Sequence, residues 1–121
     1  MKTRDQLRAE RANALVTALK PETLDEYVGE LRELPAMVVQ SGLGPALAFI
    51  KARSGPVRST VYEHLSQWVC EIVFAEPKGD LLTLIMANPA SKLMRAQEES
   101  LALAAWLRRF AEARDPKARK S

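Results

Sequence analysis

The chain has 121 residues, a formal net charge of +3 and a single cysteine. One cysteine excludes an intrachain disulfide and a cysteine-rich zinc site, so we expect a reducing, cytoplasmic setting. No apolar run approaches the roughly 20 residues that cross a bilayer, and the charged start lacks the apolar core of a signal peptide. The length favours a single domain over residues 1–121.

The charge is distributed unevenly along the chain. Residues 22–33 hold five acids and one arginine, a net charge of −4, whereas residues 100–121 hold six bases and two acids, a net charge of +4. A basic tail is expected from about residue 115. Such polarity suits either an RNA partner or copies of the chain that meet with opposite charges, and both alternatives remain open at this point.

The first expected helix covers residues 2–20, which contain good helix formers and no Gly or Pro until Pro21. Its length corresponds to about five turns. Arg4, Arg8 and Arg11 form a basic ridge at helical spacing. We interpret this ridge as a solvated side paired with acids of the same helix, with a contact to a partner as the alternative.

The second helix is expected to begin near Thr23, whose hydroxyl can cap free backbone N–H groups. An apolar stripe at helical spacing follows it. Pro35 removes a backbone donor and disfavours helical geometry in the residue before it, so we expect a kink or a restart there. Three consecutive apolar residues at 37–39 predict burial on nearly every side.

Gly and Pro residues divide the middle of the chain. The strongest break, at residues 41–45, precedes a short expected helix at 46–52 in which Phe49 faces inward. A second break at residues 54–56 precedes a core helix at 57–75. Lys51, Arg53 and Arg58 flank this second break, where we expect them to cluster and contact phosphate.

The remaining elements are a short helix at residues 81–87, capped by Asp80 and deeply buried, and a long helix at 89–114. Earlier in the chain, His64 lies at the edge of an apolar stripe. We interpret it as a hydrogen-bonded histidine packed near an aromatic ring rather than a catalytic base, because no nucleophile or second histidine accompanies it.

The last helix is expected to be the longest and to support the core. Leu103, Leu107 and Ala111 lie on its broad apolar face. Its other side combines two arginines with small apolar residues, which predicts a surface for a neighbouring subunit: Leu101, Ala102 and Ala105. Glu99 follows Arg95 by four residues, which predicts an ion pair within the helix.

These patterns predict an all-α fold: a single bundle-like domain of six or seven helices with a long C-terminal helix. They indicate no enzyme, metal or cofactor. The acids do not converge in the manner of a two-metal nuclease, the Gly-rich break lacks the Lys-Ser/Thr of a nucleotide-binding loop, and no Ser/His/Asp set is present.

Two segments of the sequence resemble a known family. They read ELPAMVVQSGLGPALAF at residues 33–49 and MRAQEESLAL with WLRRFA at residues 94–111. They resemble the small helical subunit of the type III-B CRISPR RNA-guided effector, the Cmr complex, and the likeness covers nearly the whole chain in helix order and length. The chain departs from the family's pattern at Ser41, often Asn, and at Met94, often an aromatic Tyr.

The resemblance implies a non-catalytic subunit in antiviral defence. Copies would stack in the minor filament, contact the other effector subunits and help to hold target RNA along the guide RNA. We expect sequence-independent phosphate contacts from seven cations: Lys51, Arg53, Arg58, Lys92, Arg95, Arg108 and Arg109. Two alternatives remain: a small helical DNA-binding transcription regulator with a recognition helix after residue 56, and a helical adaptor that contacts only protein.

Overall fold

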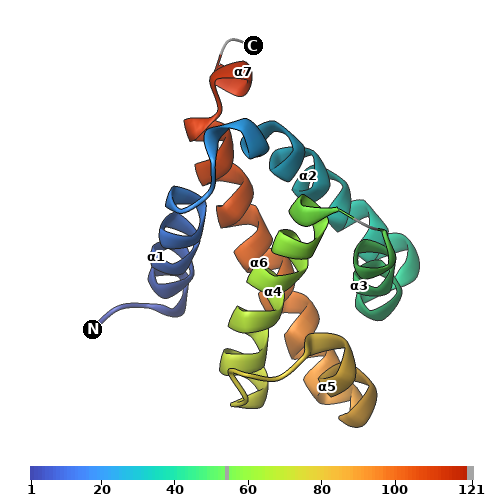
Figure 1. Ribbon diagram of the computed structural model, residues 1–121. Coiled ribbons are helices and arrows are strands. Elements are labelled where there is room, and N and C mark those ends of the chain that lie inside the picture. The colour runs from blue at the N-terminus through green and yellow to red at the C-terminus, as the bar shows by residue number, and fades with distance from the viewer. Residues whose placement is uncertain (54, 120–121) are drawn as a thin grey trace.

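The long helix α6 (Ala90–Arg114) runs through the middle of the computed structural model, which describes residues 1–53 and 55–119 (Figure 1). Three other long helices pack directly on it: α1 (Arg4–Thr17), α2 (Leu24–Ser41) and α4 (Pro56–Phe74). The shorter elements are the 3₁₀ turn η1 (Pro21–Thr23), α3 (Leu43–Ala52), α5 (Leu81–Ala87) and α7 (Pro116–Arg119). The described part of the chain contains no strand, and the predicted all-α bundle with a long C-terminal helix is confirmed.

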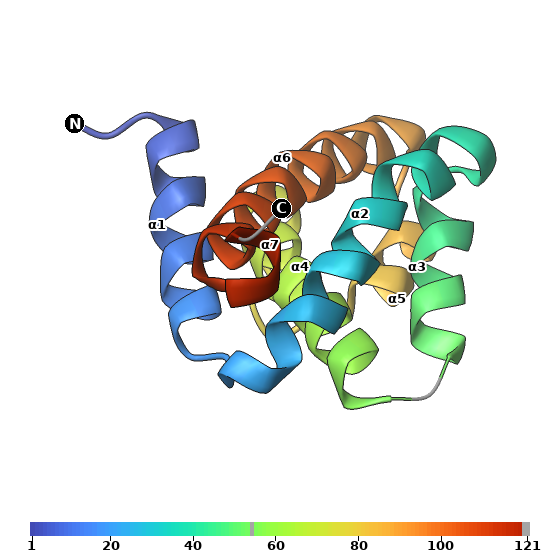
Figure 2. The same ribbon diagram turned by 90° about the horizontal axis from the view of Figure 1, so that it is seen from above.

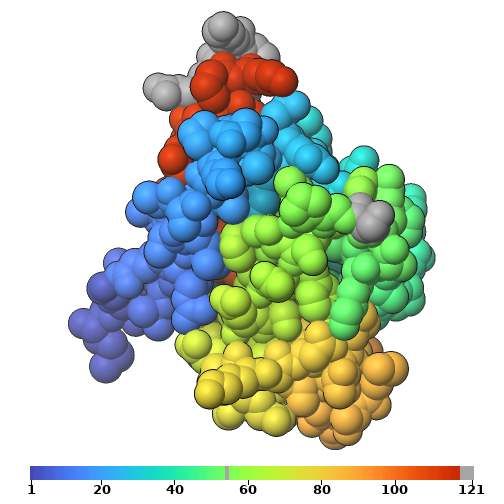
Figure 3. Space-filling model, in the orientation of Figure 1, coloured from blue at the N-terminus to red at the C-terminus, as the bar shows by residue number. Residues whose placement is uncertain are grey.

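The helices surround α6 on several sides. Seen from above, α1 lies on one side of α6 while α2 and α3 lie on the other (Figure 2). Leu103, Leu107 and Ala111 of α6 are buried among them, as the apolar periodicity predicted. Figure 3 shows one face of the molecule, where the surface of α4 is exposed between α1 and α3 with α5 below. A ligand bound beside α4 could therefore contact α3 on one side or α1 on the other.

Side-chain caps begin two of the helices, α1 and α5, and a glycine joins α2 to α3. Thr3 forms a capping box with Gln6 at the start of α1: the Thr3 hydroxyl accepts from the Gln6 backbone N–H, and the Gln6 side chain accepts from the Thr3 backbone N–H. Gly42 joins α2 to α3 with a φ of +88°, a conformation that strongly favours glycine. Asp80 caps α5 by accepting from the Thr83 backbone N–H, as predicted.

Two predictions about α2 need correction. Of the kink or restart expected at Pro35, the restart does not occur: α2 continues to Ser41, with Pro35 exposed inside it. The apolar run at residues 37–39 is not buried on every side, since the Val39 side chain is 82% exposed while Val38 is buried. The physical reason is that α2 packs against its neighbours through one face, which contains Leu34 and Val38.

The expected burial of Phe49 and Met86 is also wrong. The helix α3 begins at Leu43, so Leu43, Leu47 and Ile50 form its buried stripe, and Phe49 is 44% exposed. In α5, the buried positions are Leu81 and Ile85, four residues apart, while Met86 is 79% exposed. These helices are short and are covered on one side only.

His64 has the environment that its position predicted. It is buried on α4, where its Nδ1 lies 2.7 Å from the hydroxyl of Tyr27 on α2, and the two rings meet edge to face. Burial lowers the pKa of His64 to about 4. The imidazole is therefore neutral at physiological pH and links two core helices.

The C-terminal segment continues beyond α6. The chain forms α7 after Asp115, and Lys117 Nζ lies 3.7 Å from a carboxylate oxygen of Asp25 on α2. The last two residues of the predicted basic tail, 120 and 121, lie outside the described residues. Within residues 1–53 and 55–119, no helix is both long and apolar enough to cross a membrane.

Candidate nucleic-acid interface

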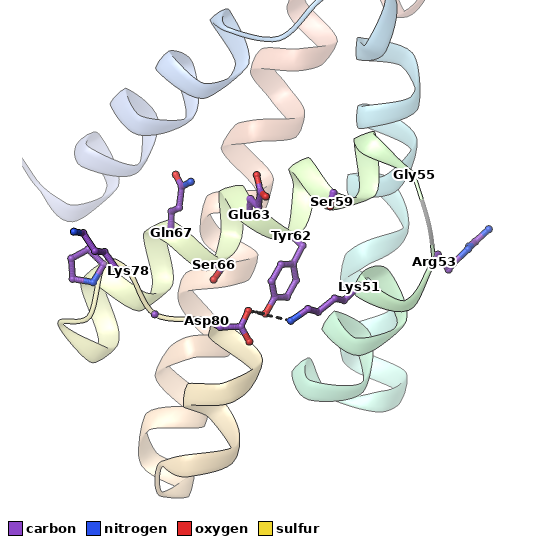
Figure 4. Close-up of a pocket in the computed structure, with 12 residues that line it drawn as sticks. Lys51, Arg53, Gly55, Ser59, Tyr62, Glu63, Ser66, Gln67, Lys78 and Asp80 are labelled. Carbon is purple, nitrogen blue, oxygen red and sulfur yellow. Dashed lines mark hydrogen bonds and ion pairs between the residues drawn. The ribbon is translucent and has the colours of Figure 1, made fainter.

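A polar hollow of about 600 Å³ opens between the end of α3, the exposed side of α4 and the loop before α5 (Figure 4). Lys51 and Arg53 of α3 line one side of it, and Lys78 of the loop lines the other. The side chains of Glu63 and Gln67 on α4 lie between them. The hollow therefore has cations at both ends, and its three cations exceed its two carboxylates, Glu63 and Asp80, by one charge, which favours an anionic ligand at those ends.

Asp80 positions Lys51 at the edge of this hollow. The Asp80 Oδ1 atom accepts from the Tyr62 hydroxyl at 2.7 Å and from Lys51 Nζ at 3.3 Å, while the Lys51 ammonium lies 5.1 Å from the centre of the Tyr62 ring. Burial alone would raise the pKa of Asp80, but hydrogen bonds from Tyr62, Thr83 and Lys51 outweigh it, and the pKa is lowered. The carboxylate is thus ionised at neutral pH and holds Lys51 in place.

Arg53 leaves the same helix end in a different direction. Its side chain points away from Asp80 in Figure 4, and its guanidinium lies 5.0 Å from the centre of the exposed Phe49 ring. Arg53 has no acidic partner among the ion pairs of the described residues. Its charge is consequently available to an anion outside the protein.

Arg58 does not join Lys51 and Arg53 at the hollow. Its Nε lies 2.9 Å from an oxygen of Glu30 on α2, and the side chains of both residues are largely buried. This pair connects α4 to α2 and accounts for one acid of the predicted acidic segment. The structure thus brings together two of the three cations expected around the break at residues 54–56.

The cations of α6 fall into two separate places. Near its start, Lys92 donates from Nζ to the backbone oxygen of Val73 at 3.1 Å, and Arg95 is exposed. Near its end, Arg108 and Arg109 both face Glu112, at 3.6 Å and 3.5 Å. The rise of a helix separates Lys92 from Arg108 by about 24 Å, so the seven predicted cations do not form one cluster.

Two of the three predicted subunit-contact residues share a surface. Leu101 and Ala105 line a hollow between α6 and α2, whereas half-buried Ala102 does not line it. Lys78 is a cation of the polar hollow that the sequence did not single out. A lone lysine in a turn carries no signal of its own, because its position depends on how the loop folds against α3 and α4.

The arginines of the basic ridge on α1 form ion pairs with acids of other helices as well as with an acid of α1. Arg8 contacts Glu99 of α6 as well as Asp5, and Arg11 contacts Glu71 of α4 at 3.1 Å. The predicted ion pair between Arg95 and Glu99 is therefore wrong: tertiary packing brings the carboxylate to α1, where it also accepts from Trp68 Nε1 at 2.9 Å. This ridge holds helices together.

The part of the chain that the structure describes contains no evident metal-binding site. No group of three or more His, Cys, Asp or Glu side chains is placed there to hold a metal ion. The one cysteine, Cys70, is buried and free, and burial raises the pKa of its thiol.

Comparison with known proteins gives consistent matches over the whole bundle. Residues 4–114 match the family described as CRISPR-associated protein (Cas_Cmr5). The chain is similar to the CRISPR system Cmr subunit Cmr5 of Thermus thermophilus, with 33% identity over 119 residues, 93% of this chain and 96% of the relative. It is also similar to the Cmr subunit Cmr5 of Thermotoga maritima, with 27% identity over 115 residues, 93% of this chain and 84% of the relative.

A solved structure gives the same result for the fold. The X-ray crystal structure of a CRISPR-associated Cmr5 family protein from Thermus thermophilus is similar with a TM-score of 0.77 and 31% sequence identity. The similarity covers 94% of this chain and 99% of that chain.

Proposed function

This chain belongs to the Cmr5 family of CRISPR-associated proteins, and we propose on that premise that it is a structural subunit of a type III-B CRISPR effector. In this role it catalyses no reaction. Copies stack in the minor filament and help to hold target RNA along the guide RNA during antiviral defence. The observation that carries the proposal is the family match over residues 4–114, which includes every long helix of the bundle.

The polar hollow is the surface proposed for RNA. Lys51, Arg53 and Lys78 line it, whereas exposed Arg95 on α6 is not part of its lining. Phosphate contacts of this kind bind RNA irrespective of its sequence, which suits a subunit that leaves sequence recognition to base pairing with the guide. Lys51, Arg58 and Lys92 already have acceptors within the protein, so their contributions to RNA binding are expected to be smaller than those of Arg53 and Lys78.

A reconstitution experiment tests both parts of the proposal. The chain is co-expressed with the other subunits of its effector, purified through a tag on one of them, and titrated with target RNA. We expect the wild-type chain to co-purify and the variant Lys51→Glu/Arg53→Glu/Lys78→Glu to assemble normally but bind target RNA more weakly. Lys20→Glu, an exposed cation outside the hollow, is the matched control.

The outcomes separate the subunit role from the RNA surface. Failure of the wild-type chain to co-purify would contradict the subunit assignment. Normal assembly with unchanged RNA binding by the triple variant would contradict the RNA surface alone. A gel-shift comparison of duplex DNA with single-stranded RNA distinguishes the alternative of a DNA regulator. The buried side chains of Trp68, Val69 and Val73 on α4 disfavour this alternative, because they pack in the core and cannot read bases.

A further inference from the structure

Three arginines share one carboxylate where α2 meets the C-terminal half of α6. Arg32 Nη2, Arg108 Nε and Arg109 Nη1 lie 3.8, 3.6 and 3.5 Å from the oxygens of Glu112. These separations exceed the roughly 2.7–2.9 Å of a charge-assisted hydrogen bond. Three positive charges against one negative charge leave the cluster with an excess of two positive charges.

One of these guanidiniums also has an unsatisfied group. The Nε of Arg108 is buried and has no hydrogen-bond partner among the described residues. Glu112 therefore satisfies this arginine only partly, since its oxygen lies 3.6 Å from the buried Nε. The charge of the cluster remains undercompensated, and the exposed guanidinium of Arg109 can bind a carboxylate or a phosphate.

An apolar hollow of about 310 Å³ adjoins the arginines. Leu31 and Pro35 of α2 form one wall, and Leu101 and Ala105 of α6 form the other. Arg108 and Arg109 also line it, so that the apolar floor and the cationic edge make up one surface. We call this surface the α2–α6 groove.

We infer that the α2–α6 groove binds an acidic segment of a protein partner, with an apolar side chain in the hollow and carboxylates on the arginines. The apolar walls favour a protein over RNA, because the hollow offers a nucleobase no aromatic ring on which to stack. The excess positive charge selects an acidic partner. The inference rests on the proposed function, since it takes the partner to be another subunit of the effector.

For Arg108 and Arg109, this assigns a protein carboxylate where the sequence suggested RNA phosphate. It also explains why Leu101 and Ala105 lie beside them. An apolar side chain docked between α2 and α6 would exclude water from the ion pairs at the groove's edge and thereby strengthen them.

The first test measures assembly without RNA. The fluorescently labelled full chain is titrated with the other effector subunits, purified as a subcomplex that lacks this chain. Ala105→Phe fills the hollow and Arg32→Glu/Arg109→Glu reverses charge at its edge, and we expect each to weaken binding about tenfold or more. Ala113→Phe, at an exposed α6 position outside the groove, and Lys20→Glu are the matched controls and should bind as the wild type does. Circular dichroism checks that all variants fold.

The second test does not require the effector. Methyl and amide NMR signals of Leu101 and Ala105 are followed during titration with three probes: a synthetic amphipathic peptide of glutamates and leucines, the same peptide with alanine replacing leucine, and decauridine RNA. We expect the leucine peptide to shift these signals at the lowest concentration.

Each outcome decides the inference. Groove variants that join the subcomplex as well as the wild type overturn it while the proposed function stands. If RNA shifts the groove signals more strongly than the leucine peptide does, the groove binds phosphate and the inference is overturned. If Ala105→Phe leaves binding to the subcomplex unchanged but abolishes self-association of the chain, the groove binds a second copy and the inference is also overturned. If the wild-type chain fails to join the subcomplex, the proposed function fails and the peptide titration alone upholds or overturns the groove's specificity.

Discussion

Arg8 and Glu99 join the first helix to the last by a two-pronged ion pair: Arg8 donates from Nε to Oε1 at 3.0 Å and from Nη2 to Oε2 at 2.7 Å. Glu99 also accepts from Trp68 on α4, so that one buried carboxylate connects three helices. Only Ala12 and Val16 of α1 are buried apolar residues. The position of α1 therefore depends strongly on this polar contact.

Removing the charge of Glu99 should destabilise the protein. Glu99→Gln removes the two-pronged partner of the partly buried Arg8 guanidinium and leaves it only the exposed Asp5, so we expect a loss of about 3 kcal/mol in the free energy of unfolding at pH 7. Urea unfolding followed by circular dichroism measures it. The control is Glu98→Gln, at an exposed neighbouring position, which should change stability by less than about 0.5 kcal/mol. Equal stabilities for the two variants would contradict the prediction.

The same ion pair should make the protein sensitive to acid. Burial raises the pKa of Glu99, but hydrogen bonds from Arg8 and Trp68 and the nearby charges of Arg8 and Arg4 outweigh burial, and the pKa falls below its usual 4.5. The stabilisation is thus fully present above pH 4.5 and is lost as the pH falls through the lowered value of the folded state. We expect the slope of unfolding free energy against pH below 4.5 to be smaller in Glu99→Gln, as measured by urea titrations at successive pH values.

The single histidine offers a second titration that NMR can resolve without ambiguity. Burial lowers the pKa of His64 from 6.5 to about 4, so its ring signals should titrate near pH 4 in the folded protein. Because the unfolded chain binds the proton more readily, stability should decline as the pH falls from about 6.5 towards 4. A His64 that titrates near 6.5 would show that the ring is hydrated.

Two glycines should respond in opposite ways to alanine. Gly42 has a φ of +88°, so Gly42→Ala should cost about 1–3 kcal/mol. Gly29 lies inside α2 with open space around its Cα, so Gly29→Ala should stabilise the protein by about 0.5–1 kcal/mol. Thermal unfolding of the two variants gives the comparison, and a stabilising Gly42→Ala would contradict the assigned junction between α2 and α3.

RNA binding by the assembled effector should depend on salt through the cations of the polar hollow. Each phosphate contact contributes about −0.7 to −0.9 to the slope of log K against log salt concentration. Lys78→Gln and Arg53→Gln should each make the slope shallower by about that amount, whereas Lys20→Gln should leave it unchanged. Filter binding at several salt concentrations measures the slopes, and identical slopes for all variants would place the RNA elsewhere.

Most helices were predictable because they depend on local sequence, but the predicted Thr23 cap is wrong: its hydroxyl donates to the Lys20 carbonyl oxygen instead of accepting from α2. Asp80 caps α5 and Gly42 ends α2 through contacts within a few residues, which a sequence pattern contains. Apolar periodicity also placed Leu103 and Leu107 correctly in the core. Apolar periodicity overestimated how much of each helix surface is buried, as exposed Phe49 shows. The buried share depends on how many neighbouring helices pack against a helix, which the local sequence does not contain.

The polar contacts were predictable only where both partners are near in sequence. Glu99 lies four residues from Arg95, yet its partner is Arg8, which is 91 residues away. The grouping of Arg32 with Arg108 across α2 and α6 likewise requires the fold. Both candidate surfaces therefore became visible only once the helices were in place, although the sequence had named Lys51 and Arg53 of one and Leu101, Ala105, Arg108 and Arg109 of the other.

The central position of α6 has a consequence for synthesis on the ribosome. Helices α1, α2, α4 and α5 all contact α6, yet α6 is translated after them. Until residues 90–114 have emerged from the exit tunnel, the apolar faces of the earlier helices lack the surface that covers them. The nascent chain consequently remains open to chaperones, and the core closes late, when its final long helix inserts between helices that are already made.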